Sequence, residues 1–287
     1  MKKILILLLC LLLVSCNKET TNVDYEKINQ IDFSNVQELE LSLHSNEYML
    51  VDLSEFKVLY GKDYDKQIYP ASLTKLMTLD VVLNNVSDLN ETSSVSSEQI
   101  SELIQLDASL AHLKSSYEYS IKDLLYALIL PSGADSAKAI ENYFDSKDMD
   151  ILVEIQKQLD KLGCNNTHFV NTTGLHDDDH YTSLNDLLKI LLDILSYDEG
   201  RKILETIDYE MADGTTLFST IKKIAMQECS ILGGKTGFTD ESGQSVMILY
   251  RINNHSYVLM LANAIDDRPN RETWHFDDAI EIINYLY

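Results

Sequence analysis

The chain has 287 residues, and 46 acidic against 23 basic side chains give a formal net charge of −23 at pH 7. With 45% hydrophobic and 24% charged residues, it has the composition of a globular protein and is too apolar for a disordered one. A pI near 4.5 argues against a nucleic-acid partner, because phosphate contacts need clustered Lys and Arg. The length allows one large domain or two small ones.

The N-terminus has the pattern of an export signal. Lys2 and Lys3 precede an apolar run over 4–14, which is too short to span a bilayer as a helix. The run ends in Leu-Val-Ser-Cys at Cys16, which resembles the lipobox of bacterial lipoproteins. That resemblance implies that 1–15 is a cleaved lipoprotein signal peptide and that Cys16 carries a membrane-anchoring lipid outside the cytoplasm. An ordinary secretory signal with an incidental Cys is the alternative.

A polar stretch over 16–38 is predicted to be a tether, followed by one domain over 39–287. Two short strands are expected over 48–51 and 57–60, around a turn-like Asp-Leu-Ser-Glu segment. Pro70 then precedes a helical stretch from Ser72 to about Asn84.

The middle of the chain is predicted to be helical, as a subdomain over about 88–205. Helices are expected to begin near Ser96, which has Gln99 at capping-box spacing, and after Ser183, a candidate N-cap. Between them, a helix over 120–130 should stop at Pro131, and apolar residues spaced by three and four should end at a C-cap on Gly163.

The C-terminal part is predicted to form strands over 230–239, 244–252 and 256–264, joined by hairpin-like turns. An amphipathic helix over about 277–285 closes the chain. Strands at both ends with helices between them indicate an α+β protein whose single antiparallel sheet is built from both chain ends.

The first chemical motif is Ser72-Leu-Thr-Lys75. On a helix, residues three apart share a face, so the Lys75 amine can reach the Ser72 hydroxyl. A serine needs an adjacent base, and a lysine serves as one only if burial or neighbouring charge lowers its pKa. The Ser-x-x-Lys pattern alone is weak evidence for a catalytic pair, because it also begins at Ser15, Ser54 and Ser219.

The second motif is Lys235-Thr236-Gly237, which lies in a glycine-rich predicted strand. The amine and hydroxyl form a plausible carboxylate clamp, and the glycines suit a strand that a ligand backbone approaches closely. The third motif is Ser132, followed by Gly133 in a break between two predicted helices. Taken alone, Ser132 would be interpreted as a helix N-cap.

In this order, the three motifs resemble the penicillin-binding proteins and serine β-lactamases. More narrowly, the chain resembles the low-molecular-mass serine D-alanyl-D-alanine carboxypeptidases of peptidase family S11, over about 48–264. Matching blocks include 70–78, 166–175 and 234–239. The resemblance implies a β-lactamase/DD-peptidase-like α+β fold: a five-stranded antiparallel sheet flanked by helices, with an inserted all-helical subdomain.

The resemblance also implies roles for individual residues. Ser72 would attack the penultimate D-Ala of a peptidoglycan stem peptide, with Lys75 taking its proton and Ser132 relaying protons to the leaving amine. Lys235 and Thr236 would hold the terminal carboxylate. Gly237 leads to Phe238, whose backbone N–H would form the oxyanion hole with that of Ser72. β-Lactam antibiotics would acylate the same serine, and no cofactor or metal is implied.

One position departs from the family pattern. The second motif is usually Ser-x-Asn, and Ala134 stands at the Asn position. A methyl group cannot bond the substrate carbonyl or the catalytic lysine. Asp135 is one residue further and would point about 100° away on a helix. Weakened activity is the expected consequence.

Two alternatives share the fold. A non-catalytic surface lipoprotein that binds wall peptides is favoured only by Ala134. A β-lactamase is disfavoured because no E-x-x-L-N segment occurs in the chain.

Two histidine-containing patterns suggest metal-binding sites. The loop 176–180 carries two histidines among three aspartates, for which a solvated acidic turn is the simpler interpretation. A faint similarity to zinc D,D-peptidases at His44 and Trp274 lacks the required Asp, because Val51 stands seven residues after His44. Cys164 and Cys229 are expected to be small buried residues, with a bond between them possible.

Overall fold

The computed structural model describes residues 31–223, 229–265 and 273–286. The expected signal peptide and its Cys16 lie outside the described residues. Within the described part, no helix is both long and apolar enough to cross a membrane.

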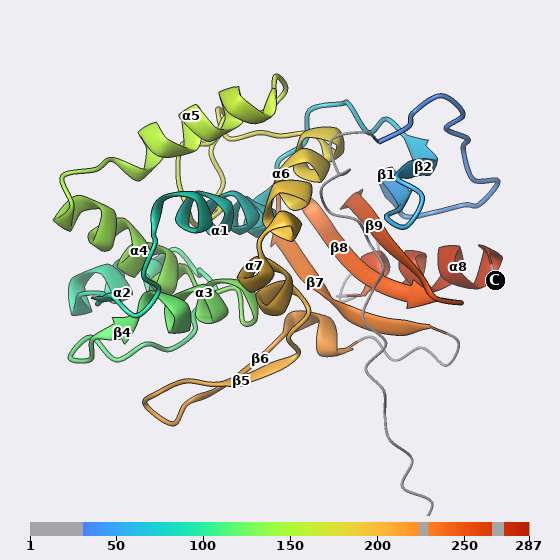
Figure 1. The fold of residues 1–287 in the computed structure, drawn as a ribbon. Helices are drawn as coiled ribbons and strands as arrows, with labels where there is room; N and C mark the ends of the chain where they lie inside the picture. Colours follow the sequence, from blue (N-terminus) through green and yellow to red (C-terminus); the bar gives the residue numbers. More distant parts are fainter. Residues whose placement is uncertain (1–30, 224–228, 266–272, 287) are drawn as a thin grey trace, which may run out of the picture.

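A five-stranded antiparallel sheet joins the two ends of the chain (Figure 1). The strand order is β2-β1-β9-β8-β7, which confirms a single main sheet built from both ends. The β8–β9 hairpin turns at Asn253 and Asn254, both with positive φ, as its asparagine pair predicts. The strands are β1 (Ser45–Asp52), β2 (Lys57–Lys62), β7 (Ser230–Thr239), β8 (Gly243–Ile252) and β9 (His255–Ala264).

The helices divide between the two faces of this sheet. Helix α8 (Trp274–Leu286) packs on one face with a core that includes Leu50, Ile248 and Leu259. The opposite face carries Met49 and the larger core under the remaining helices. Strand residues therefore alternate between two apolar cores, as expected of a sheet covered on both sides.

The helical part follows β2 in the chain and surrounds α1. In Figure 1, helices α2–α5 gather on one side of the molecule and the sheet lies on the other. The Ser96 capping box, the left-handed Gly163 C-cap and the Ser183 N-cap all form as predicted. The elements are the 3₁₀ turns η2 (Ala71–Leu73) and η3 (Thr220–Lys223), helices α1 (Thr74–Asn85), α2 (Ser97–Gln105), α3 (Ile121–Ile129), α4 (Ala134–Ser146), α5 (Ile151–Leu162), α6 (Leu184–Ser196) and α7 (Asp198–Leu204), and the short strands β3 (Thr92–Ser93), β4 (Tyr119–Ser120), β5 (Asp208–Glu210) and β6 (Thr216–Phe218).

Residues 31–38 differ from their expectation as part of a polar tether. Asp32 and Gln37 form isolated bridges with Lys57 and Tyr60 of β2. The Gln37 carbonyl accepts from the amide of Gly61 at 2.9 Å. An edge strand presents unpaired backbone groups, and this segment pairs with some of them. Ile31 and Val36 also pack against the larger core. The ordered domain therefore begins before residue 39, because backbone pairing and these two apolar contacts hold the segment.

A pair of carboxyl groups, the buried Asp80 and the half-buried Asp193, links α1, α5 and α6. The Gln158 amide donates to Asp80 Oδ2 at 2.9 Å and to Asp193 Oδ2 at 2.8 Å. Asn84 also donates to both carboxyl groups. Burial, and then the neighbouring Asp193, raise the pKa of Asp80 well above its ordinary value. Asp80 is therefore protonated in the folded protein at pH values where it is ionised in the unfolded chain.

Replacing Asp80 by Asn should flatten the pH dependence of stability. Between the ordinary pKa near 3.8 and the raised one, the folded state holds a proton that the unfolded state releases. The contribution of Asp80 to stability should therefore fall as pH rises through this window, by up to about 1.4 kcal/mol per pH unit. Urea unfolding at several pH values measures the slope, with the exposed Asp208→Asn as control. Equal slopes in Asp80→Asn and the wild type would contradict the raised pKa of Asp80.

Candidate active site

The first candidate pair, Ser72 and Lys75, forms at the start of α1. Ser72 lies in the 3₁₀ turn η2, and Lys75 follows on the first turn of the helix. The Lys75 Nζ donates to Ser72 Oγ at 3.0 Å and to the carbonyl of Thr173 at 2.5 Å. The predicted sharing of one helix face is confirmed, and the amine lies within proton-transfer reach of the hydroxyl.

Lys75 is buried, with 1% of its surface exposed. Burial lowers the pKa of its amine to about 7, while the charge of Asp135 acts in the opposite direction. Near neutral pH a substantial fraction of Lys75 is therefore a free amine. Its lone pair can accept the Ser72 proton, which an ammonium group cannot do.

The second pair joins Ser132 to Lys235. Ser132 lies in the break between α3 and α4 with a positive φ of 66°. The Lys235 Nζ donates to Ser132 Oγ at 2.8 Å and to the Thr236 carbonyl at 2.7 Å. Lys235 is fully buried, and burial followed by the positive charge of Lys75 holds its pKa well below the ordinary range. The structure thus connects the second and third motifs directly.

Both pairs face one cleft of about 730 Å³. Ser72, Ser132 and Thr236 line it, while Lys235 lies behind its wall. Phe238 is exposed at the rim. The three motifs therefore converge as expected. The lining residues are Ser72, Asp107, Ser109, Ser132, Thr220, Thr236, Gly237, Phe238, Asp240, Gly243, Gln244, Ala264, Ile265, Trp274, His275 and Phe276.

The glycines of β7 have close neighbours within the protein. The sequence suggested room for a ligand backbone, and Gly237 does line the cleft, but backbone atoms of the protein itself also lie close to these glycines. A Cβ on Gly233 would lie 1.8 Å from the Leu204 carbonyl oxygen. One on Gly237 would lie 3.0 Å from the carbonyl oxygen of Pro70. The absence of a side chain at Gly237 therefore lets β7 pack against the turn that carries Ser72.

Ala134 and Asp135 begin helix α4. The Ala134 amide donates to the Ser109 carbonyl at 2.8 Å, and its methyl group is buried. The Asp135 carboxylate accepts from the amides of Ala111 and Leu113 at 2.8 and 2.9 Å. Asp135 therefore fixes the loop before β4 and is not a substitute for the missing Asn amide.

A buried histidine supports the turn that carries Ser72. The Val170 amide donates to His180 Nδ1 at 3.0 Å, so the ring proton is on Nε2. That nitrogen lies 2.7 Å from Thr74 Oγ1, which donates to the Ala71 carbonyl at 2.8 Å. Burial lowers the pKa of His180 to about 4, so the ring is neutral near pH 7. The sequence had placed His180 in a solvated turn, and nothing in its spacing revealed this role.

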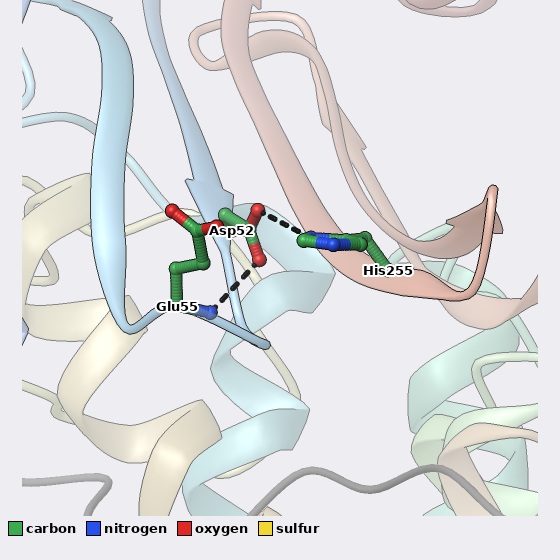
Figure 2. A group of neighbouring side chains, drawn as sticks. All are labelled: Asp52, Glu55 and His255. Atoms are coloured by element: carbon green, nitrogen blue, oxygen red, sulfur yellow. Dashed lines mark hydrogen bonds and ion pairs between the residues drawn. The ribbon is translucent and has the colours of Figure 1, made fainter.

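Neither of the other candidate metal clusters includes a residue of the three motifs. His44 and Trp274 stack with ring centroids 5.8 Å apart, and Trp274 also lines the cleft. Figure 2 shows Asp52, Glu55 and His255, the only group of metal-ligating type found among the described residues. The Asp52 carboxylate accepts from the Glu55 amide at 3.0 Å and lies 3.0 Å from His255 Nδ1. These bonds join the β1–β2 turn to the β8–β9 hairpin, which is a structural role.

The two cysteines of the described region do not form the disulfide bond that the sequence left open. Cys164 is buried, as expected, whereas Cys229 is half-buried. Burial raises the pKa of the Cys164 thiol to about 12, so it is a poor nucleophile.

An antiparallel sheet covered by helices, with a serine and a buried lysine beside its edge strand, is the arrangement of a serine DD-peptidase. The family model "D-alanyl-D-alanine carboxypeptidase" of peptidase S11 matches residues 33–264, and the chain belongs to this family.

The named relatives include a D-alanyl-D-alanine carboxypeptidase and a D-alanyl-D-alanine endopeptidase. D-alanyl-D-alanine carboxypeptidase DacF of Bacillus subtilis is 26% identical over 207 residues, which cover 71% of this chain and 53% of the relative. This chain therefore spans about half the length of that protein. The D-alanyl-D-alanine endopeptidase of Escherichia coli is 26% identical over 247 residues, covering 84% and 77% of the two chains.

Solved structures agree on the fold. The Streptomyces K15 DD-transpeptidase superimposes with a TM-score of 0.75 at 21% identity, covering 86% of this chain and 98% of its own. Penicillin-binding protein D2 of Listeria monocytogenes, in its ampicillin-bound form, gives a TM-score of 0.71 at 25% identity with the same coverage.

Proposed function

We propose that the protein is an exported serine-type D-Ala-D-Ala carboxypeptidase that removes the terminal D-Ala from peptidoglycan stem peptides. One observation carries the proposal: the Lys75 amine lies 3.0 Å from Ser72 Oγ. Its pKa of about 7 makes it a competent base at neutral pH.

The reaction begins when Ser72 Oγ attacks the carbonyl carbon of the penultimate D-Ala and passes its proton to Lys75. The C–N bond to the terminal D-Ala then breaks, and the leaving amine takes a proton relayed through Ser132. Water hydrolyses the resulting ester on Ser72 and restores the hydroxyl. The Lys235–Ser132 bond of 2.8 Å supports this relay, because it holds the second hydroxyl at the cleft.

The backbone N–H groups of Ser72 and Phe238 are the proposed oxyanion hole. The close approach of Gly237 to Pro70 supports it, because it sets the two backbones side by side. Each such donor stabilises the transition state by about 3 kcal/mol. Lys235 and Thr236 would bind the terminal carboxylate of the peptide or of a β-lactam, and β-lactams would acylate Ser72. Ampicillin is bound in the Listeria relative.

The lipobox-like sequence at Cys16 supports a lipid anchor that holds this domain outside the cytoplasm, at the membrane surface. Globomycin, which blocks lipoprotein signal peptidase, should leave the precursor uncleaved in cells. Cells fed an alkyne-bearing fatty acid should label the wild-type protein and not Cys16→Ala, and equal labelling of the two proteins would contradict the anchor.

D-Ala release from a diacylated Lys-D-Ala-D-Ala peptide tests the proposed activity. The wild-type chain over 17–287 should release D-Ala, and Ser72→Ala should not. Equal release by both proteins, or none by either, would contradict the proposal.

A weakly active or non-catalytic binding protein is the second candidate, favoured by the buried methyl group of Ala134. Ala134→Asn should raise kcat/KM for D-Ala release about 10-fold, because it restores a carboxamide that can bond the substrate carbonyl. Thermal unfolding of both proteins controls for lost folding. Unchanged or lower kcat/KM in a folded variant would mean that the missing Asn does not limit turnover.

A further inference from the structure

The end of the cleft near Lys235 is lined by hydroxyl groups. Among the described residues that line the cleft, none is a lysine or arginine. Lys235 itself is fully buried behind Ser132 and the Thr236 carbonyl. Hydroxyls that reach the cleft at this end belong to Ser132, Thr220 and Thr236. A ligand anion placed here therefore meets hydroxyl donors directly, with the amine behind them.

Thr220 is the member of this group that no motif includes. The Thr236 hydroxyl donates to Thr220 Oγ1 at 2.8 Å. The Thr220 amide donates to the Leu130 carbonyl at 3.1 Å, two residues before Ser132. Thr220 is therefore held between the turn that carries Ser132 and strand β7, and it is fixed on both sides.

The direction of the hydroxyl–hydroxyl bond leaves one proton available. Thr236 gives its proton to Thr220 Oγ1, so the proton of Thr220 points elsewhere. No described residue accepts it, and Thr220 is half-buried at the cleft wall. A carboxylate has two acceptor oxygens and bonds to hydroxyl donors more strongly than a neutral group does.

The neighbouring serine does not compete for this role. Ser219 begins one of the S-x-x-K patterns of the sequence, but it is buried. Its Oγ accepts from the Ile221 amide at 3.3 Å and so closes the η3 turn. The residue that reaches the cleft is therefore Thr220.

We propose that the Thr220 hydroxyl, which Thr236 orients, donates a hydrogen bond to the terminal carboxylate of the substrate and so selects peptides with a free C-terminus. This inference rests on the proposed function for the nature of the ligand. Loss of one hydrogen bond to a charged group weakens binding about 10- to 100-fold. Binding of a peptide with a neutral C-terminal carboxamide should be weakened far less by the same loss.

Binding without turnover separates this inference from the proposed activity. In the Ser72→Ala background, the Kd is measured for a diacylated Lys-D-Ala-D-Ala peptide and for its C-terminal carboxamide. We expect the carboxylate peptide to bind at least about 10-fold more tightly. Adding Thr220→Val should remove most of that preference by weakening the carboxylate peptide alone.

Matched variants keep the result interpretable. Thr220→Ser keeps the hydroxyl and should retain the carboxylate preference. Thr216→Val makes the same change at an exposed position on β6 and should leave both Kd values as they were. A full carboxylate preference in Thr220→Val, equal weakening of both peptides, or no preference in Ser72→Ala itself would overturn the role of Thr220. Retained binding selectivity with no D-Ala release by the wild type would contradict only the hydrolase.

Discussion

Replacing Lys75 by Met is expected to slow penicillin acylation of Ser72 about 1,000-fold, because the variant keeps the shape of the side chain and loses the base. Fluorescent-penicillin labelling over time measures the rate. Lys157→Met makes the same change at an exposed lysine on α5 and should label as the wild type does. Labelling of the Lys75→Met variant within 10-fold of the wild-type rate would show that another group accepts the proton.

The same lysine sets the expected pH dependence. Only the neutral amine accepts a proton, so the wild-type acylation rate should fall as pH drops below about 7. Stability should change in the same direction. Between pH 7 and 10.5 the folded state holds a neutral Lys75 while the unfolded chain is protonated, so stability rises with pH through this window. The Lys75→Met variant should lack this rise in stability with pH, which urea unfolding at several pH values measures.

Gly174→Ala is expected to have the second large effect. Gly174 has a φ of +79°, and a Cβ there would lie 2.0 Å from the carbonyl oxygen of Ala71 and 2.9 Å from the amide nitrogen of Ser72. The turn that carries the nucleophile would have to move. We expect a loss of more than about 4 kcal/mol of stability, and acylation should fall sharply in any protein that still folds.

Gly163→Ala is the matched control for this change. Gly163 also has a positive φ, of +66°, but a Cβ there would meet no atom within 4 Å. It should cost only the backbone penalty of about 1 kcal/mol and leave acylation unchanged. Similar losses in Gly163→Ala and Gly174→Ala would mean that the backbone conformation, and not contact with Ala71 and Ser72, causes the effect.

Much of the fold was predictable from local patterns. Strands β7 and β9, the Ser96 capping box and the Gly163 C-cap each have a signal within a few residues. The segment 31–38 was missed because backbone pairing with an edge strand leaves no periodicity in the sequence. Local sequence patterns therefore predict helices and strands well, but they poorly predict where an irregular segment packs against the sheet.

The residues of the candidate site also divide into those that the sequence predicted and those that it did not. Ser72, Lys75 and Lys235 were predicted, because their spacing and order carry chemistry. Thr220 contacts Thr236 of β7, 16 residues away in the sequence, and His180 contacts Thr74 of α1, 106 residues away. No pattern around either residue indicates such a contact, so the three-dimensional arrangement was needed to find them.

Mapping the site of penicillin attachment tests the central claim most directly. The wild-type chain over 17–287 is treated with benzylpenicillin, digested, and analysed by mass spectrometry. The proposed mechanism predicts one adduct with the mass of the intact drug, on the peptide that contains Ser72 and absent from Ser72→Ala. No adduct, or an adduct on a peptide that contains Ser132 or Ser219, would contradict Ser72 as the nucleophile.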